Sequence, residues 1–109
     1  MNLAEDPSEN FNLDEMFENS RAATGFLKAL AHEGRLMILC HLITGEKSVT
    51  ELENLLSVRQ AAISQQLARL RLEGVVKTRR DGKAIYYTIK DSKAHKLIRL
   101  LHDEFCAAK

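Results

Sequence analysis

Apolar residues recur every three or four positions in two long stretches near the ends of the chain, as they do along one face of an amphipathic helix. The first stretch is predicted to begin after Asn12, a suitable helix N-cap, and to run to a break at residues 31–34. The last stretch follows Asp91 or Ser92, either of which can cap a helix. Its predicted inner face comprises Ala94, Leu97, Ile98, Leu101 and Phe105.

Two shorter helices are predicted between these stretches, in the first half of the chain. Residues 35–44 are apolar on most sides, as in a helix at the centre of a core, and Gly45 ends this helix. Ser48 and Glu51 have the spacing of a capping box, in which two side chains bond to free amides at a helix start. The helix over residues 49–56 is expected to bury Leu52, Leu55 and Leu56.

A turn at residues 57–58 leads to a fourth helix over residues 59–74, whose inward side is predicted to hold Ile63, Leu67 and Leu70. Strands at residues 75–80 and 84–89 flank Asp81-Gly82, a dipeptide that favours a hairpin turn. The predicted fold is mainly α with a two-stranded β wing: four helices, two strands and a last helix. It is a winged helix-turn-helix domain at residues 12–109, preceded by a mobile N-terminal arm at residues 1–11.

Charge is distributed unevenly along the chain, although its 109 residues carry a formal net charge of only +1. Residues 1–20 contain six acidic residues and no Lys or Arg, whereas residues 59–90 contain eight Lys or Arg and two acidic residues. This basic segment coincides with the predicted fourth helix and hairpin, which indicates one face that binds a polyanion. A basic surface that is merely solvated is the alternative reading of the charge.

In a winged helix-turn-helix, the second helix of the pair enters the major groove of DNA, and the wing reaches phosphates or the minor groove. Gln pairs with adenine edges, Arg with guanine and Ser with a base or a phosphate, while Ala permits close approach. Tyr86 and Tyr87 point to opposite sides of a strand, so one of them faces outward. The predicted DNA-binding residues are Gln60, Ala61, Ser64, Gln65, Arg69, Arg79, Arg80, Lys83 and Tyr87.

Other classes of function have little support in the sequence. The chain contains no Gly-rich phosphate loop and no nucleophile elbow, so we expect a protein that is not an enzyme and needs no cofactor. No apolar run approaches the roughly 20 residues of a membrane span, and the acidic N-terminus lacks a signal-peptide pattern, which favours a cytoplasmic location. The alternative outside DNA binding is a winged helix that docks on another protein.

A homodimer is expected, because a single domain of this size reads too little DNA for tight specific binding. Two copies about one helical turn apart would read an inverted repeat in a double-stranded operator. The amphipathic first and last helices are the predicted dimer surface. The alternative is that these helices only close the core of the monomer.

These features together resemble the ArsR/SmtB family of repressors over nearly all of residues 20–105, most specifically in LKALAHEGRLMIL, SQQLARLRLEGVV and RRDGKAIYYTI. The resemblance implies a homodimeric repressor that leaves its operator when a ligand binds or a thiol changes. The family's metal sites do not carry over. The helix at residues 49–56 lacks a cysteine, and Lys93 and Phe105 stand where the zinc site of the last helix has ligands, so no metal is expected.

Cys40 and Cys106, with the ending HDEFCAAK, resemble the dithiol branch of this family, the SqrR and BigR type. The resemblance implies reduced thiols in the DNA-bound protein and a disulfide or polysulfide bridge formed in response to persulfides, sulfide or oxidants. DNA is then released, and genes of sulfide metabolism or detoxification are expressed. Two alternatives stay open: Cys40 is a small buried hydrophobe, or His41 and His102 join the cysteines in a zinc or copper site of a metal-responsive repressor.

Overall fold

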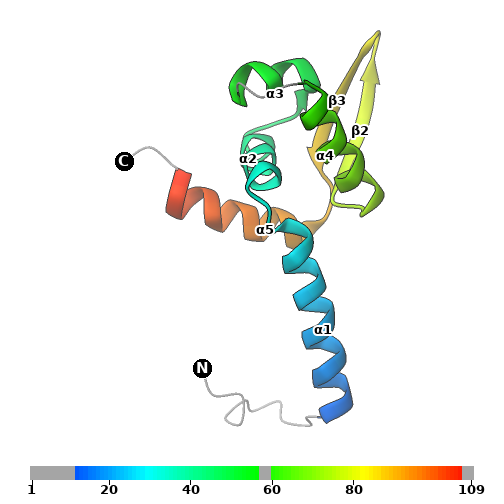
Figure 1. Ribbon diagram of the computed structural model, residues 1–109, viewed down its shortest axis with the longest axis vertical. Helices are drawn as coiled ribbons and strands as arrows, with labels where there is room; N and C mark the ends of the chain where they lie inside the picture. The colour runs from blue at the N-terminus through cyan, green and yellow to red at the C-terminus, as the bar shows by residue number, and fades with distance from the viewer. Residues whose placement is uncertain (1–11, 57–59, 107–109) are drawn as a thin grey trace. The chain divides into compact units, whose positions relative to one another are not determined.

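The computed structural model describes residues 12–56 and 60–106 of the chain and divides it into two units (Figure 1). The predicted arm at residues 1–11, the turn at residues 57–58 and Arg59 lie outside the described residues. The first unit contains helix α1 (Leu13–Leu30). The second unit, from residue 32 onward, contains four more α-helices and a small sheet, as expected for a winged helix-turn-helix domain.

Helix α1 starts at the predicted cap. The Asn12 side chain accepts hydrogen bonds from the backbone amides of Asp14, at 2.8 Å, and Glu15, at 3.4 Å. Several apolar side chains of α1 are exposed, among them Leu13 and Phe17 at 67% and 68%. Neither α1 nor any other helix among the described residues is long and apolar enough to span a membrane.

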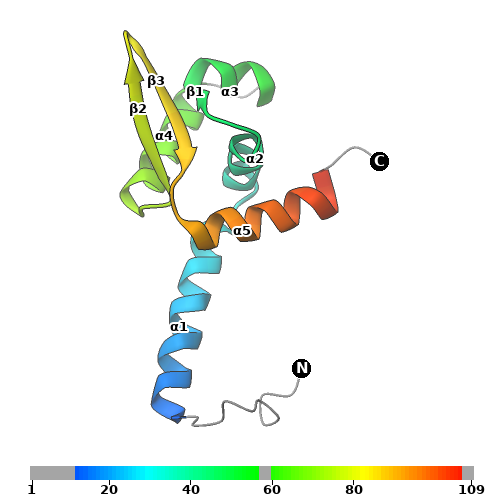
Figure 2. The same ribbon diagram turned by 180° about the vertical axis from the view of Figure 1, so that it is seen from behind.

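The core of the second unit is formed by α2 (Glu33–Leu42), α3 (Val49–Leu56), α4 (Gln60–Leu72), α5 (Ser92–Leu101) and the sheet. Figures 1 and 2 show α2 beside α5 from opposite sides. The inward positions predicted for α4 are confirmed. The buried apolar residues of this unit are Ile38, Leu39, Leu42, Leu52, Ile63, Leu67, Leu70, Val75, Val76, Ala94 and Ile98.

Helix α2 is offset from its predicted bounds at both ends. It begins at Glu33, two residues early, because His32 caps it: the His32 Nδ1 atom accepts a hydrogen bond from the Gly34 amide at 3.1 Å. It ends at Leu42, two residues early, in a turn that leaves Gly45 with a positive φ of 142°, a conformation that glycine adopts readily. A break between the two helices is therefore present, but it covers residues 31 and 32 only, and Gly45 lies three residues beyond the end of α2.

Two residues predicted to be buried are exposed instead. Leu55 is 51% exposed, because the last turn of the eight-residue helix α3 borders a hollow rather than another helix. Phe105 is 79% exposed, because the chain leaves α5 in a π-helical turn, His102–Cys106, whose wider winding ends the inward stripe of α5. Both errors arise where regular periodicity stops.

The predicted two-stranded hairpin is present, and a short additional strand pairs with it to make a three-stranded antiparallel sheet. Its strands are β1 (Lys47–Ser48), β2 (Val76–Asp81) and β3 (Ala84–Ile89), in the order β1-β3-β2. The hairpin turns at Gly82, where φ is +63°, as the Asp-Gly dipeptide predicted. Strand β1 was not predicted, because a strand of two residues is too short to show an alternating pattern of apolar and polar positions. Its pairing with β3 joins the wing to the segment that enters α3.

Candidate functional site

The orientation of α4 is fixed by its buried side. Ile63, Leu67 and Leu70 are at most 1% exposed, so the opposite face of the helix must point to solvent. A hydrogen bond of 2.8 Å from Arg35 Nε to Gln66 Oε1 also ties α4 to α2. The buried stripe and this hydrogen bond together fix which face of α4 is turned outward.

The outer face of α4 carries the side chains predicted to read DNA. Ala61, Ser64, Gln65 and Arg69 are all exposed. Gln60 begins α4, but its side chain lies outside what the structure describes. Arg69 Nε lies 3.8 Å from Glu73 Oε1 in an exposed pair one helical turn apart, a kind of contact that constrains a side chain little. This face can approach a groove without rearrangement of the core.

The hairpin tip projects beyond the helices of its unit in both views (Figures 1 and 2). Arg80 and Lys83 flank the turn at Gly82 and are exposed, as phosphate contacts must be. Tyr87 is half-buried and borders a hollow with Ala68, Arg71 and Leu72, on the α4 side of the sheet. The structure thus places Tyr87 beside the second half of α4, next to residues other than those predicted to contact DNA.

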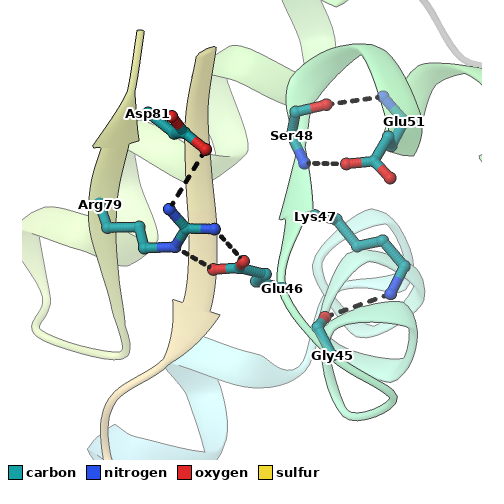
Figure 3. A network of polar contacts seen from close by, with 7 residues as sticks. All are labelled: Gly45, Glu46, Lys47, Ser48, Glu51, Arg79 and Asp81. Carbon is teal, nitrogen blue, oxygen red and sulfur yellow. Dashed lines mark hydrogen bonds and ion pairs between the residues drawn. The ribbon is translucent and has the colours of Figure 1, made fainter.

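Arg79 differs from the other wing cations, because its guanidinium already has partners (Figure 3). Arg79 Nε donates to Glu46 Oε2 at 2.7 Å, and Nη2 donates to Glu46 Oε1. Nη1 lies 3.9 Å from Asp81 Oδ2, and the guanidinium carbon lies 4.8 Å from the centre of the Tyr86 ring. The Arg79 hydrogen bond lowers the pKa of Glu46, and in return Glu46 raises the pKa of Arg79.

Glu46 is a residue of this surface that the sequence did not reveal. It lies 33 positions before Arg79, in the connection between α2 and α3, and no local pattern links the two. The connection itself is well bonded: the capping box predicted for Ser48 and Glu51 is present, with reciprocal bonds of 3.0 and 3.1 Å (Figure 3). Glu46 is therefore attached to a segment of defined geometry.

The second candidate site is a pair of thiols. Cys40 lies on α2 and Cys106 ends the π-helical turn after α5, yet their Sγ atoms are 3.9 Å apart within one chain. Both thiols are free, with Cys40 half-buried and Cys106 exposed. The pairing depends on the contact between α2 and α5, which brings residues 66 positions apart together.

Burial raises the pKa of the Cys40 thiol to about 11, and the hydrogen bond and the charge of Cys106 add to this effect. Burial also lowers the pKa of His41, and the nearby charges of Lys47 and His102 lower it further. Both effects favour neutral groups around Cys40. The Cys40 thiolate is therefore scarce at neutral pH, and Cys40 should react more slowly than an ordinary cysteine for that reason.

A hollow of about 530 Å³ opens beside the two cysteines. Its walls are mostly apolar, and its lining residues are Glu33, Leu36, Met37, Cys40, His41, Leu55, Leu56, His102 and Cys106. His102 Nδ1 is buried and makes no oriented hydrogen bond, although Asp103 Oδ1 lies 3.5 Å away. Among the described residues, no three His, Cys, Asp or Glu side chains are grouped to hold a metal ion. A small molecule can reach the thiols through this hollow.

Known proteins are similar to this chain in sequence and in fold. Residues 32–78 match the family described as bacterial regulatory protein, arsR family. The chain is 45% identical over 97 residues to the transcriptional activator HlyU of Vibrio cholerae, which covers 89% of this chain and 90% of that protein. A solved structure of reduced HlyU from V. cholerae has a TM-score of 0.80 and 44% identity, over 85% of this chain and 98% of that one. The transcriptional repressor BigR from Xylella fastidiosa has a TM-score of 0.81 and 40% identity, over 87% of this chain and 94% of that one.

Proposed function

This chain belongs to the arsR family of bacterial regulatory proteins, and we propose that it is a repressor that reactive sulfur species release from DNA through Cys40 and Cys106. Family membership makes it a DNA-binding transcriptional regulator and not an enzyme. The observation that carries the sulfur proposal is the 3.9 Å distance between the two Sγ atoms in a single chain. Two thiols this close can be joined by a sulfur donor with small movements of the chain.

The proposed chemistry starts at Cys106, because its side chain is exposed whereas Cys40 is half-buried with a raised pKa. The Cys106 thiolate attacks the outer sulfur of a persulfide RSSH, forming Cys106–S–SH and releasing the thiol RSH. The Cys40 thiolate then attacks the Sγ atom of Cys106, which forms the Cys40–Cys106 disulfide, breaks the bond from that Sγ to the outer sulfur and releases the outer sulfur as hydrogen sulfide. One persulfide is thereby reduced to a thiol and a sulfide, the two protein thiols lose two electrons, and their protons leave with the products.

A bridge with more than two sulfur atoms suits the resting distance better than a disulfide. The outer sulfurs of a trisulfide lie about 3.3 Å apart, and those of a tetrasulfide about 4.3 Å apart, given S–S bonds of about 2 Å. The 3.9 Å between Cys40 and Cys106 falls between these values. For a trisulfide, each cysteine first takes up one sulfur atom and becomes a persulfide. The outer sulfur of one persulfide then attacks the Sγ atom of the other cysteine, whose own outer sulfur leaves as hydrogen sulfide. This route consumes two RSSH and releases two RSH and one hydrogen sulfide.

In this proposal the protein is a homodimer in the cytoplasm, where its thiols stay reduced until reactive sulfur species accumulate. Exposed apolar side chains on both terminal helical segments support dimerisation, among them Phe17 on α1 and Leu100 on α5. A bridge from α2 to the end of α5 would change the surface that the last helix offers to a second copy. The spacing of the two α4 helices on an inverted repeat would change with it, and operator affinity would fall.

The proposed DNA contacts are those predicted from the sequence apart from Arg79, whose guanidinium already bonds to Glu46. The outer face of α4 would lie in the major groove, with Gln60, Ala61, Ser64, Gln65 and Arg69 toward the bases. Arg80 and Lys83 would contact phosphates, with Tyr87 toward the backbone. The exposure of Ser64, Gln65 and Arg69 beside a buried inner stripe supports this arrangement.

The test uses duplexes of about 30 base pairs that the reduced wild-type protein selects from a randomised pool, long enough for two half-sites. Affinity is measured by fluorescence anisotropy before and after treatment with glutathione persulfide, and mass spectrometry counts the sulfur atoms between the two cysteines. The wild type should lose affinity about tenfold or more, a usual range for coupling between sites, and dithiothreitol should restore it. Cys40→Ser and Cys106→Ser are matched controls, which should bind as reduced wild type does and ignore the persulfide.

Two results would contradict the proposal at different levels. Unchanged affinity of a protein in which mass spectrometry shows both cysteines bridged would refute the sulfur switch while leaving DNA binding intact. Failure of the reduced wild type to enrich any duplex at low salt would refute the operator-binding role itself.

A further inference from the structure

We propose that Glu46 and Arg79 form a clamp that sets the position of the wing relative to α4, so that Arg79 acts as a positioning residue and not as a phosphate contact. The clamp would act in DNA binding alone and is independent of the sulfur chemistry at Cys40 and Cys106.

The clamp joins two parts of the fold that meet DNA differently. Glu46 lies directly before β1 and α3, the entry to the helix-turn-helix, whereas Arg79 lies in the middle of β2, on the way to the hairpin tip. Strand β1 pairs with the edge of β3 that faces away from β2, and Lys47 lies opposite Tyr87 in this pairing. Both long strands of the wing are thus attached to the same short segment, β3 by backbone pairing and β2 by the Glu46 carboxylate.

Arg79 is occupied in a way that an isolated surface ion pair is not. Its Nε and Nη2 atoms bond to separate oxygens of Glu46, which is the two-pronged geometry that fixes a guanidinium in a plane. Asp81 approaches a third nitrogen, and the Tyr86 ring lies against the guanidinium. A single exposed pair contributes little, but a two-pronged pair within a network constrains both partners. A phosphate would have to displace Glu46 to bond to Nε and Nη2 of Arg79, the two atoms suited to a two-pronged contact.

The segment that carries Glu46 is itself held firmly. Lys47 Nζ donates to Gly45 O and to Thr44 Oγ1, each at 3.2 Å, and the Ser48–Glu51 capping box follows directly (Figure 3). A carboxylate on such a segment can hold the wing at a fixed angle, while Arg80 and Lys83 at the tip stay free to meet phosphates. The angle of the wing matters for phosphate contacts, because a small rotation of β2 near Arg79 becomes a larger displacement of Arg80 and Lys83 at the hairpin tip.

The experiment compares Glu46→Gln with Glu18→Gln, which removes the same charge from an exposed position on α1. Affinities of the reduced proteins are measured for the selected duplex and for a scrambled duplex of equal length. Loss of a negative charge alone should leave DNA binding unchanged or strengthen it. The clamp predicts instead that Glu46→Gln weakens binding to the selected duplex by about fivefold and leaves binding to the scrambled duplex unchanged. A fivefold loss is less than a mismatched base pair costs in many sites.

Arg79→Lys provides the second variant, since it keeps the charge but cannot make the two-pronged bond. It should match Glu46→Gln, and the double variant should be no weaker than either single one, because each already breaks the same contact. Equal losses on both duplexes, additive losses in the double variant, or unchanged or tighter binding by Glu46→Gln would each overturn the proposal. Urea midpoints close to wild type would exclude unfolding as the cause of a selective loss.

Discussion

The raised pKa of Cys40 makes a quantitative prediction about its rate of alkylation by iodoacetamide, which reacts with thiolates. With a pKa of about 11, only about one Cys40 thiol in a thousand is ionised at pH 8, whereas about a quarter of free cysteine is, with its pKa of about 8.5. The more basic thiolate is the better nucleophile, which recovers about a factor of ten. Cys40 in the reduced protein should therefore react about twentyfold more slowly than free cysteine.

The assay is site-resolved mass spectrometry of initial labelling rates between pH 7 and 10. Because ionisation limits the reaction, the Cys40 rate should keep rising about tenfold per pH unit up to pH 10, while the rate of free cysteine levels off above about pH 9. In Cys106→Ala the hydrogen bond and charge of Cys106 are lost but burial remains, so the Cys40 profile should move only part of the way toward that of free cysteine. A Cys40 rate that levels off near pH 9 in the wild type would refute the reasoning.

Four further predictions concern the fold and the DNA surface. Ser48→Ala should lower the free energy of unfolding by about 1 kcal/mol in urea through loss of the capping box, and the neighbouring Thr50→Ala should cost much less. Leu67→Ala should cost about 2–5 kcal/mol by leaving a cavity at a fully buried position, and a loss below 1 kcal/mol would mean that the site can collapse. Backbone hydrogen bonds to the carboxylate of Asp91, the N-cap of α5, lower the pKa of Asp91. The ionised carboxylate therefore stabilises the fold fully above about pH 4, and this stabilisation is lost as acid protonates Asp91. The difference in free energy of unfolding between wild type and Asp91→Asn should narrow below that pH. Arg80→Gln removes one proposed phosphate contact from each copy, so it should reduce the slope of log affinity against log salt by about two per bound dimer. An unchanged slope would remove Arg80 from the phosphate contacts.

Local patterns predicted most of the element order, because helix periodicity and capping depend on residues three or four positions apart. The inward stripe of α4 and the cap at Asn12 are examples. The same patterns were wrong where regular winding ends, at Leu55 and Phe105. A helical stripe carries no information about a short helix that borders a hollow or a chain that widens into a π-helical turn.

Local sequence patterns could not predict contacts between segments that are far apart in the chain. Both cysteines could be singled out from the sequence, but their proximity was implied only by a family resemblance, and the 3.9 Å distance is a property of the packing of α2 on α5. Glu46 had no sequence signal at all, because its partner Arg79 belongs to another element. Charge counting placed Arg79 with Arg80 as equivalent cations, whereas the fold gives them different surroundings.

The Glu46–Arg79 pair also affects how the protein should respond to ionic strength. Counterion release alone gives a straight line when log affinity is plotted against log salt. The two side chains are exposed at 53% for Arg79 and 34% for Glu46, so added salt screens their attraction as well. A loosened wing at high salt would then add its own loss of affinity to that of the phosphate contacts. The plot should bend downward at high concentrations for the wild type and stay straight for Glu46→Gln.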